Sequence, residues 1–217
     1  MDERLNEFQG RFVTLEPINQ HDADDLFAAL AGADLDDLCF FMADRPSHDR
    51  EAFTAFVSRR AMSKDRRYFV CIPTGGKASG FLSFMRDEPA HRVIEIGDVF
   101  FAPPLQRSAA ATEAVFLMAR HAFETLHYRR LEWKCDKLNA PSYRAAQRFG
   151  FTYEGLFRQH MLVHGKSRDT AWFSMLDSEW PARKAVFERW LDPANFDAQG
   201  QQREALGVMM AKAIPAT

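Results

Sequence analysis

The chain has 217 residues, of which 47% are hydrophobic and 27% are charged, and its formal net charge is −2. This balance is typical of a globular protein that buries a sizeable core, and it argues against a nucleic-acid partner. The three cysteines are scattered without zinc-ligand spacing, so we expect reduced thiols, no metal and a cytoplasmic location. The N-terminus is charged and no apolar run reaches the length of a membrane span, so we expect no membrane partner.

The first half of the chain is predicted to form one strand and two helices, followed by three consecutive strands. Residues 21–32 and 49–63 carry apolar side chains at helical spacing, and the segment between them is expected to be a loop or a short helix. Runs of aromatic and β-branched residues bounded by turns predict the strands. The predicted strands are 11–18, 67–73, 78–86 and 92–101.

The second half is predicted to alternate helices and strands before a polar end. The predicted helices are 112–126, 139–150 and 180–191, and the predicted strands are 129–135, 151–163 and 168–177, the last two as a hairpin. This order predicts an α+β fold with one mixed sheet, covered by helices on both faces, and a strand–helix–strand crossover. We expect one domain over 1–191 and a polar tail with one weak helical pattern over 192–217.

The turn between the strand at 92–101 and the helix at 112–126 is rich in small side chains. It reads Gln106-Arg107-Ser108-Ala109-Ala110-Ala111-Thr112. Backbone N–H groups at a helix start lack intrahelical acceptors and carry the positive end of the helix dipole. Small residues leave such donors open to an anion such as a pyrophosphate. The alternative is a solvated loop before an alanine-rich helix start.

A second group of polar residues opens the helix at 139–150. Asn139 occupies the predicted N-cap and Ser142 follows three positions later, while Gly150 ends the helix. Taken alone, this pattern fits a simple cap followed by a polar residue in the first turn. Tyr143 is a second hydroxyl nearby, but one position along a helix turns it about 100° away.

Together the two motifs resemble the GNAT superfamily of acyl-CoA N-acyltransferases. The turn at 106–111 is similar to the family pattern Gln/Arg-x-x-Gly-x-Gly/Ala. Asn139, Ser142, Gly150 and Phe151 are similar to the family's later motif, which has the same spacing. Within the superfamily, the chain resembles the branch that contains the ribosomal-protein N-terminal (alanine/serine) acetyltransferases.

The resemblance covers residues 10–177 and implies a twisted, mostly antiparallel sheet of about seven strands. The chain departs from the family at Ala109, where glycine is usual. A methyl group fits there if the local φ is negative, but it narrows the room for phosphates and bears on the affinity for the cofactor.

The resemblance implies that acetyl-CoA is the co-substrate and that its pyrophosphate lies on the backbone of the small-residue turn. It also implies that the strand before this turn opens away from the strand at 129–135, so that its backbone can pair with the pantetheine arm. The residues assigned in this way to the cofactor are Val99, Phe100, Phe101, Gln106, Arg107, Ser108, Ala109, Ala110, Ala111, Thr112, Asn139 and Ser142.

Acetyl transfer to an amine needs a neutral amine and a proton for the leaving thiolate. The resemblance assigns Ser142 as a candidate proton donor to the sulfur, and Asn139 as a contact of pantetheine or of the intermediate. Glu95 is the leading candidate for the base, because it lies on the strand that leads into the turn; the alternative is a solvent-facing strand residue. Asp98 is a rival only if a bulge turns it inward, and Glu154 is a third candidate.

The segment 33–46 combines aspartates with aromatic residues. Acidic groups beside an aromatic wall suit a cationic amine, although ordinary helix capping next to core phenylalanines is the alternative. The resembling branch places its acceptor groove between this loop and the hairpin at 158–168. The residues assigned to the acceptor are Asp34, Asp37, Phe40, Phe41 and Met42.

We therefore expect an acetyl-CoA-dependent N-acetyltransferase that modifies a primary amine by direct attack in a ternary complex. The amine would belong to a peptide or protein N-terminus or to a small cationic molecule, and a homodimer is left open. The alternative is a non-catalytic acyl-CoA-binding module with the same fold. Ala109, in place of the usual glycine, is the residue that favours this alternative. A dinucleotide-dependent dehydrogenase is excluded, because GxGxxG and repeated parallel units are absent. His160 and His164 are expected in a strand hairpin and not in a metal site.

Overall fold

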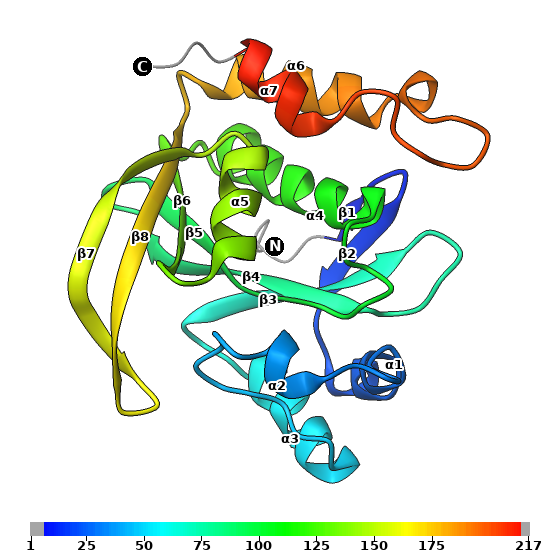
Figure 1. Ribbon diagram of the computed structural model, residues 1–217, viewed down its shortest axis with the longest axis vertical. Coiled ribbons are helices and arrows are strands. Elements are labelled where there is room, and N and C mark those ends of the chain that lie inside the picture. Colours follow the sequence, from blue (N-terminus) through cyan, green and yellow to red (C-terminus); the bar gives the residue numbers. More distant parts are fainter. Residues whose placement is uncertain (1–6, 214–217) are drawn as a thin grey trace. The chain divides into compact units, whose positions relative to one another are not determined.

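The computed structural model describes residues 7–213, and their strands form an eight-stranded sheet in the order β1-β2-β3-β4-β5-β6-β8-β7 (Figure 1). Strands β5 and β6 pair in parallel, whereas β1–β2, β2–β3, β3–β4, β6–β8 and β7–β8 are antiparallel. The strands are β1 (Phe8–Gln9), β2 (Val13–Pro17), β3 (Arg66–Pro73), β4 (Gly80–Glu88), β5 (Val93–Phe101), β6 (Arg130–Asp136), β7 (Thr152–Val163) and β8 (Lys166–Leu176).

The α+β class and the mixed, mostly antiparallel sheet are confirmed. The sheet has eight strands instead of about seven because β1, which pairs with β2, is only two residues long. So short a strand gives no alternating pattern in the sequence, and only its pairing makes it visible.

The helices follow the predicted order, with one informative difference at a helix start. Helix α4 begins at Ala109, three residues before the predicted start, and its last turn continues as a π-helical turn over His121–Thr125. The small residues of the predicted turn are therefore the first turn of a helix. The helices are α1 (Ala23–Ala28), α2 (Leu35–Leu38), α3 (Arg50–Ala61), α4 (Ala109–Arg120), α5 (Ala140–Arg148), α6 (Trp180–Leu191) and α7 (Leu206–Ala213).

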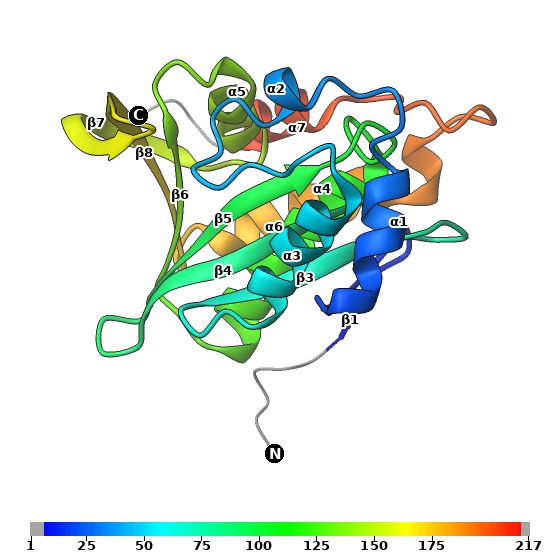
Figure 2. The ribbon, with the colours of Figure 1, turned by 90° about the horizontal axis from the view of Figure 1, so that it is seen from below.

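The chain divides into two compact units, and the first comprises the chain up to Arg86 together with Ile96–Leu117. Here α1 packs against α3, and α3 packs against β3 (Figure 2). The core is aromatic: Phe81 stacks on Phe100 with ring centroids 5.0 Å apart, and Phe56 lies 6.0 Å from Phe81. Buried aromatic rings of this size supply most of the apolar area that stabilises such a unit.

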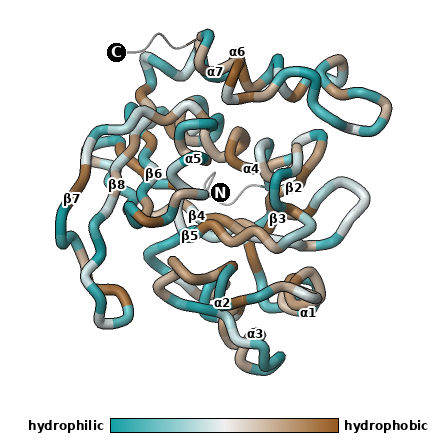
Figure 3. Tube along the Cα trace, viewed as in Figure 1, coloured by the Kyte–Doolittle hydropathy of each residue, from teal (hydrophilic) through white to brown (hydrophobic). Residues whose placement is uncertain are grey.

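The second unit comprises Asp87–Glu95 and the chain from Met118 onward. Helix α7 packs on α6 and buries Leu206, Met209 and Met210, so the segment after 191 contributes to the core of this unit. The loop between α6 and α7 is hydrophilic in the hydropathy trace (Figure 3). No helix within residues 7–213 is long and apolar enough to cross a membrane. All three cysteines of the chain are free and buried.

Candidate active site

The start of α4 is built by Ser108, which acts as its cap. The Ser108 hydroxyl accepts a hydrogen bond from the Ala111 backbone N–H at 3.0 Å and donates to the Leu105 carbonyl at 2.6 Å. Ala110 and Ala111 are buried, so their methyl groups face the core. Their small size is therefore needed for packing, and the part of the turn that a ligand can reach is Gln106 to Ala109.

The backbone before this helix contains one residue in the left-handed region. Arg107 has φ +56°, in the left-handed region, and the helical residues of α4 follow it closely. The Gln106 and Ser108 N–H groups donate to the Ala102 and Leu105 carbonyls, and the helix start carries a partial positive charge. Ala109 is itself helical, so the methyl group that replaces the usual glycine causes no backbone strain.

Glu113 anchors the same helix to the first strands, a role that the sequence analysis missed. Its carboxylate accepts backbone N–H donors from Arg11 at 2.9 Å, Phe12 at 2.5 Å and Val13 at 3.0 Å. Three such bonds to a charged, buried acceptor are individually strong. They fix α4, and with it the turn at its start, relative to the β1–β2 connection. No pattern in the sequence pairs residues a hundred positions apart.

The end of strand β5 can contact a ligand through its backbone more readily than through its side chains. The Phe100 ring is buried in the core, while Val99 and Phe101 are half-buried. The Gln106 side-chain amide donates to the Phe101 carbonyl at 2.9 Å. The backbone groups of Val99 and Phe100 therefore remain the main candidates for a partner on this strand.

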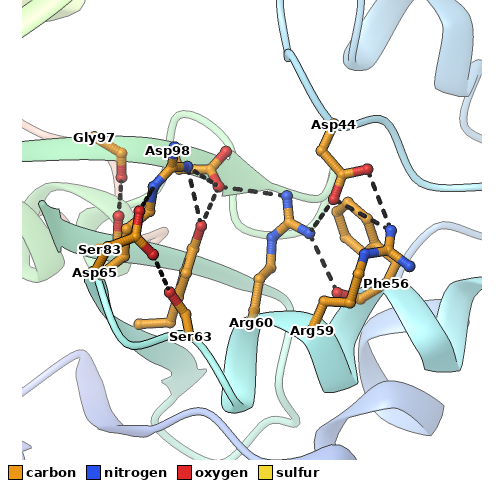
Figure 4. Close-up of polar contacts among 11 residues, drawn as sticks. Asp44, Phe56, Arg59, Arg60, Ser63, Asp65, Ser83, Gly97 and Asp98 are labelled. Carbon is orange, nitrogen blue, oxygen red and sulfur yellow. Dashed lines mark hydrogen bonds and ion pairs between the residues drawn. The ribbon is translucent and has the colours of Figure 1, made fainter.

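Asp98 does turn inward, as its candidacy for the base required, but it enters a network of cations (Figure 4). Its φ is +47°, and the side chain is only 13% exposed. The carboxylate accepts from the Tyr68 hydroxyl at 2.5 Å and from Arg60 and Arg66 at 3.3 Å each. Burial, followed by the Asp98 charge, raises the pKa of Tyr68 to about 12.

Arg60 extends this network toward the loop that precedes α3. Its guanidinium is 4% exposed and lies 3.5 Å from the centre of the Phe56 ring. It pairs with Asp98 on one side and with Asp44 at 3.0 Å on the other, and the exposed Arg59 also contacts Asp44 (Figure 4). A single buried cation thus links strand β5 to the loop at 33–49.

The segment 33–49, which includes α2, contains residues that cap a helix, residues that pack on the core and residues that are exposed. Asp34 caps α2 by accepting from the backbone N–H groups of Asp36 and Asp37, which is the capping role given above as the alternative. Met42 packs on the core, and Phe41 is half-buried. Phe40 is 55% exposed, contacts Phe41 edge-on and lies under the Arg45 guanidinium. The side chains that can face a ligand are those of Asp36, Asp37 and Phe40.

In the second unit, the start of α5 presents the predicted pair of polar residues. Asn139 caps the helix, since its Oδ1 accepts the Ser142 backbone N–H at 3.0 Å. The Ser142 hydroxyl accepts a hydrogen bond from the Trp133 indole at 3.0 Å and is half-buried. Burial raises the pKa of Cys135, and a hydrogen bond from Ser142 partly offsets this rise. Ser142 therefore lies in a fixed environment that includes a sulfur atom.

Tyr143 packs its ring against Phe173 at 4.8 Å and Tyr153 at 5.7 Å. Desolvation raises the pKa of its hydroxyl, so the phenol stays protonated at neutral pH. Tyr143 is thus a half-buried aromatic residue of α5 that packs on the sheet.

Glu95 is buried and ion-paired. Its carboxylate lies 2.9 Å from Lys134 Nζ, which is also 2.7 Å from Glu132 and 3.7 Å from the centre of the Trp172 ring. The side chains of Glu95 and Lys134 are 6% and 5% exposed, so the picture of a solvent-facing strand residue is wrong. In this unit Val93–Glu95 pair in parallel with Arg130–Glu132.

Glu154 belongs to the same chain of charges. The two terminal nitrogens of Arg130 donate to the Glu154 carboxylate at 2.7 and 2.6 Å, and Arg130 Nε donates to Glu132 at 2.8 Å. Ser174 donates to Glu154 at 2.6 Å. The Arg130 hydrogen bonds lower the pKa of Glu154 below its usual value, against a smaller opposing effect of burial. Ion pairs thus connect three carboxylates with two cations, and these five side chains are Glu95, Glu132, Glu154, Arg130 and Lys134.

His160 and His164 lie in the β7–β8 hairpin, where His160 Nδ1 is 3.0 Å from Thr170 Oγ1. Among residues 7–213, no three His, Cys, Asp or Glu side chains lie together in a way that could hold a metal ion.

The sequence and structure comparisons identify the family of this protein. The family model for the acetyltransferase (GNAT) domain matches residues 13–152, and the chain belongs to this family. Members of the family transfer an acetyl group and use acetyl-CoA as the donor.

Relatives of known structure or sequence support the assignment. The crystal structure of a GCN5-related N-acetyltransferase from Brucella melitensis is 45% identical, with a TM-score of 0.91 over 95% of this chain and 94% of that one. The "Uncharacterized N-acetyltransferase YnaD" of Bacillus subtilis (strain 168) is 27% identical over 54% of this chain and 75% of its own length. The "Putative ribosomal N-acetyltransferase YdaF" of the same organism is 28% identical over 50% of this chain and 59% of its own length.

Proposed function

We propose that this acetyltransferase modifies a primary amine, which belongs to a peptide or protein N-terminus or to a small cationic molecule. The amine attacks acetyl-CoA directly in a ternary complex. The amine nitrogen forms a bond to the thioester carbonyl carbon, and the C–S bond then breaks. The amine loses one proton to a base, and the thiolate of CoA gains one from an acid. The observation that carries this proposal is the fixed hydroxyl of Ser142 at the start of α5, in the family's motif.

The phosphate end of acetyl-CoA is assigned to the start of α4. The turn from Gln106 to Ala109 supports this assignment because it is accessible and lies at the N-terminus of α4, where the helix dipole favours an anion. The buried Ala110, Ala111 and Thr112 contribute through packing. The backbone of Val99–Phe101 is assigned to the pantetheine arm.

Ser142 is assigned as the acid and Asn139 as the residue that positions it. Asn139 fixes the first turn of α5 through its side-chain oxygen, which sets the place of the Ser142 hydroxyl. The Ser142 hydroxyl carries one proton, which it can donate to the leaving sulfur. Water can then return a proton to Ser142. Tyr143, whose raised pKa keeps it protonated, is the alternative donor.

Glu95 is assigned as the base, within the chain of charges around Lys134. Glu95, Glu132 and Glu154 lie beside Lys134 and Arg130, so the proposed base is held in a fixed network of ion pairs. Lys134 holds Glu95 at a fixed distance, which suits either direct proton transfer or transfer through one water molecule.

The acceptor is assigned to the segment 33–46. The exposed side chains of Asp36 and Asp37 raise the local concentration of a cation, and Phe40 offers an exposed apolar face. The buried Arg60 pairs with the exposed Asp44, and this ion pair helps to hold the segment in place.

The test is the release of free CoA from acetyl-CoA in the presence of defined amines. The panel contains peptides with N-terminal alanine or serine, spermidine and kanamycin, with an N-acetylated peptide as the matched blank. We expect turnover with at least one free amine and none with the blank. Tight binding of CoA by calorimetry without turnover on any amine would instead identify an acyl-CoA-binding module.

A further inference from the structure

Ser142 is held by Trp133, a residue of β6 outside the family motif. Trp133 is 5% exposed, and its Nε1–H donates to Ser142 Oγ at 3.0 Å. The indole ring packs against Phe149 and Phe151, with centroids 6.0 and 5.9 Å away. Ser142 is fixed in turn by its backbone bond to Asn139. Donor and acceptor are therefore both immobilised by the fold.

The direction of this hydrogen bond decides what the hydroxyl can do. An indole nitrogen only donates, whereas a serine hydroxyl has one proton and two lone pairs. By accepting from Trp133, Ser142 uses a lone pair and not its own proton. Hydrogen bonds in a chain polarise one another, so this arrangement also strengthens the donation of that proton.

We propose that Trp133 is a positioning residue that holds the Ser142 hydroxyl as the proton donor to the sulfur of CoA. The inference rests on the proposed function, in which the leaving thiolate takes its proton from Ser142. The C–S bond breaks with its electron pair on sulfur, the Ser142 proton moves to the sulfur, and water returns a proton to Ser142. Trp133 acts only through Ser142 and touches no reacting atom.

A purely structural role is the competing explanation, because a buried indole N–H needs an acceptor wherever it lies. The two explanations differ in their kinetic signatures. Loss of a structural bond lowers the stability of the fold. Loss of a positioning bond lowers kcat and leaves the KM for acetyl-CoA unchanged, because the bond acts on the departure of the thiolate and not on binding.

Trp133→Phe removes the N–H and keeps a packed ring. With the best amine of the panel, we expect kcat to fall on the order of three- to tenfold, the usual worth of one hydrogen bond, at unchanged KM for acetyl-CoA. In a Ser142→Ala background, the same substitution should cause no further fall. The matched control is Trp190→Phe, which removes an equivalent bond to Gln202 at 2.9 Å and should leave kcat unchanged.

A second measurement needs no acceptor. Calorimetry compares the affinity of CoA with that of desulfo-CoA, which lacks the sulfur atom. We expect the wild type to prefer CoA by about two- to fivefold, the worth of a weak hydrogen bond, and both Trp133→Phe and Ser142→Ala to bring the ratio toward one. This result stands even if no amine of the panel is acetylated, in which case the proposed acceptor class fails and the role of Trp133 is still decided.

The inference is overturned if Trp133→Phe keeps the wild-type kcat and affinity ratio, or if it lowers kcat equally in the Ser142→Ala background. A wild-type kcat in Ser142→Ala alone would remove Ser142 from the proposed mechanism, and the role of Trp133 would be lost with it. A fall in kcat for Ser142→Ala together with an unchanged Trp133→Phe enzyme would leave the proposed function standing and reject only the role of Trp133.

Discussion

Gly10 lies so close to Glu113 that a Cβ atom added to the glycine would be 2.3 Å from the Glu113 carboxylate oxygen. The carboxylate cannot move away without losing backbone N–H donors from the β1–β2 connection. The same Cβ would also lie 2.9 Å from the Val13 carbonyl oxygen. Glycine is therefore required here by the close approach of a buried acceptor.

Gly10→Ala should lower the free energy of unfolding by about 1–3 kcal/mol, because the added methyl group overpacks a site that cannot relax. Urea denaturation measures the change. Gly155→Ala is the control, since a Cβ at Gly155 meets no atom within 4 Å. Equal effects in the two variants would show that the Glu113 contact is not what disfavours a side chain at Gly10.

Arg60 and Arg59 offer a matched pair, because both contact Asp44 but only Arg60 is buried. Arg60→Met should cost about 2 kcal/mol or more, since it leaves Asp98 short of a cation in a largely buried position. Arg59→Met should cost about 0–1 kcal/mol, as expected for an exposed pair. Thermal denaturation of the two variants tests this order, and a larger loss for Arg59→Met would contradict it.

The pKa of Glu154 predicts a dependence of stability on pH. Because hydrogen bonds from Arg130 lower this pKa below 4.5, the interaction stabilises the fold above about pH 4.5 and is lost as the pH falls through the folded-state value. Glu154→Gln should therefore be less stable than the wild type at pH 7, and the difference should shrink below about pH 4.5. Urea denaturation from pH 7 to pH 3 measures it, with the exposed Glu88→Gln as control. A difference that grows toward low pH would refute the assignment.

Two alanines of the α4 start should respond differently to a bulky side chain. Ala109→Phe should weaken CoA binding by about tenfold or more, equivalent to about 1.4 kcal/mol, with little change in stability. Ala111 is 6% exposed, so Ala111→Phe should instead destabilise the fold. Calorimetry with CoA and thermal denaturation separate the two effects. Unchanged CoA affinity in a folded Ala109→Phe variant would argue against the proposed phosphate site.

The acidic loop predicts a salt-sensitive acceptor KM. Replacing Asp36 and Asp37 with Asn should raise the KM for spermidine or another cationic amine by about two- to tenfold at low salt, and should flatten its dependence on salt. The KM for acetyl-CoA should not change. Asp34→Asn is the control, because Asn also caps a helix well. A preference for neutral or anionic acceptors would show that the aspartates serve only the helix.

Much of the fold follows from the sequence, because long elements have strong periodic patterns. Helix α6 and the strands β3 to β6 lie within one or two residues of their predicted positions. The start of α4 differed because alanine suits a turn that must admit a ligand and a helix that must pack tightly. The cap at Asn139 was predictable for a local reason, since N-caps are set by residues three positions apart.

The candidate site was less predictable where it depends on contacts distant in sequence. Glu95 was placed on the correct strand, but its burial beside Lys134 depends on the pairing of β5 with β6. Asp98 depended on a left-handed backbone angle in the middle of a strand, which side-chain alternation does not encode. Trp133 was counted as an ordinary strand residue, since an indole that binds a hydroxyl looks the same in sequence as one that only packs.

Cys39, Cys71 and Cys135 are all buried, and burial raises the pKa of each thiol, that of Cys39 to about 12. Only an exposed thiolate reacts readily with a disulfide dye. The thiols of the folded protein should therefore react very slowly with such a dye, and the colour that develops during turnover measures the released CoA. Unfolding would expose three further thiols per chain, so the same dye reports catalysis in an intact sample and damage in a heated one.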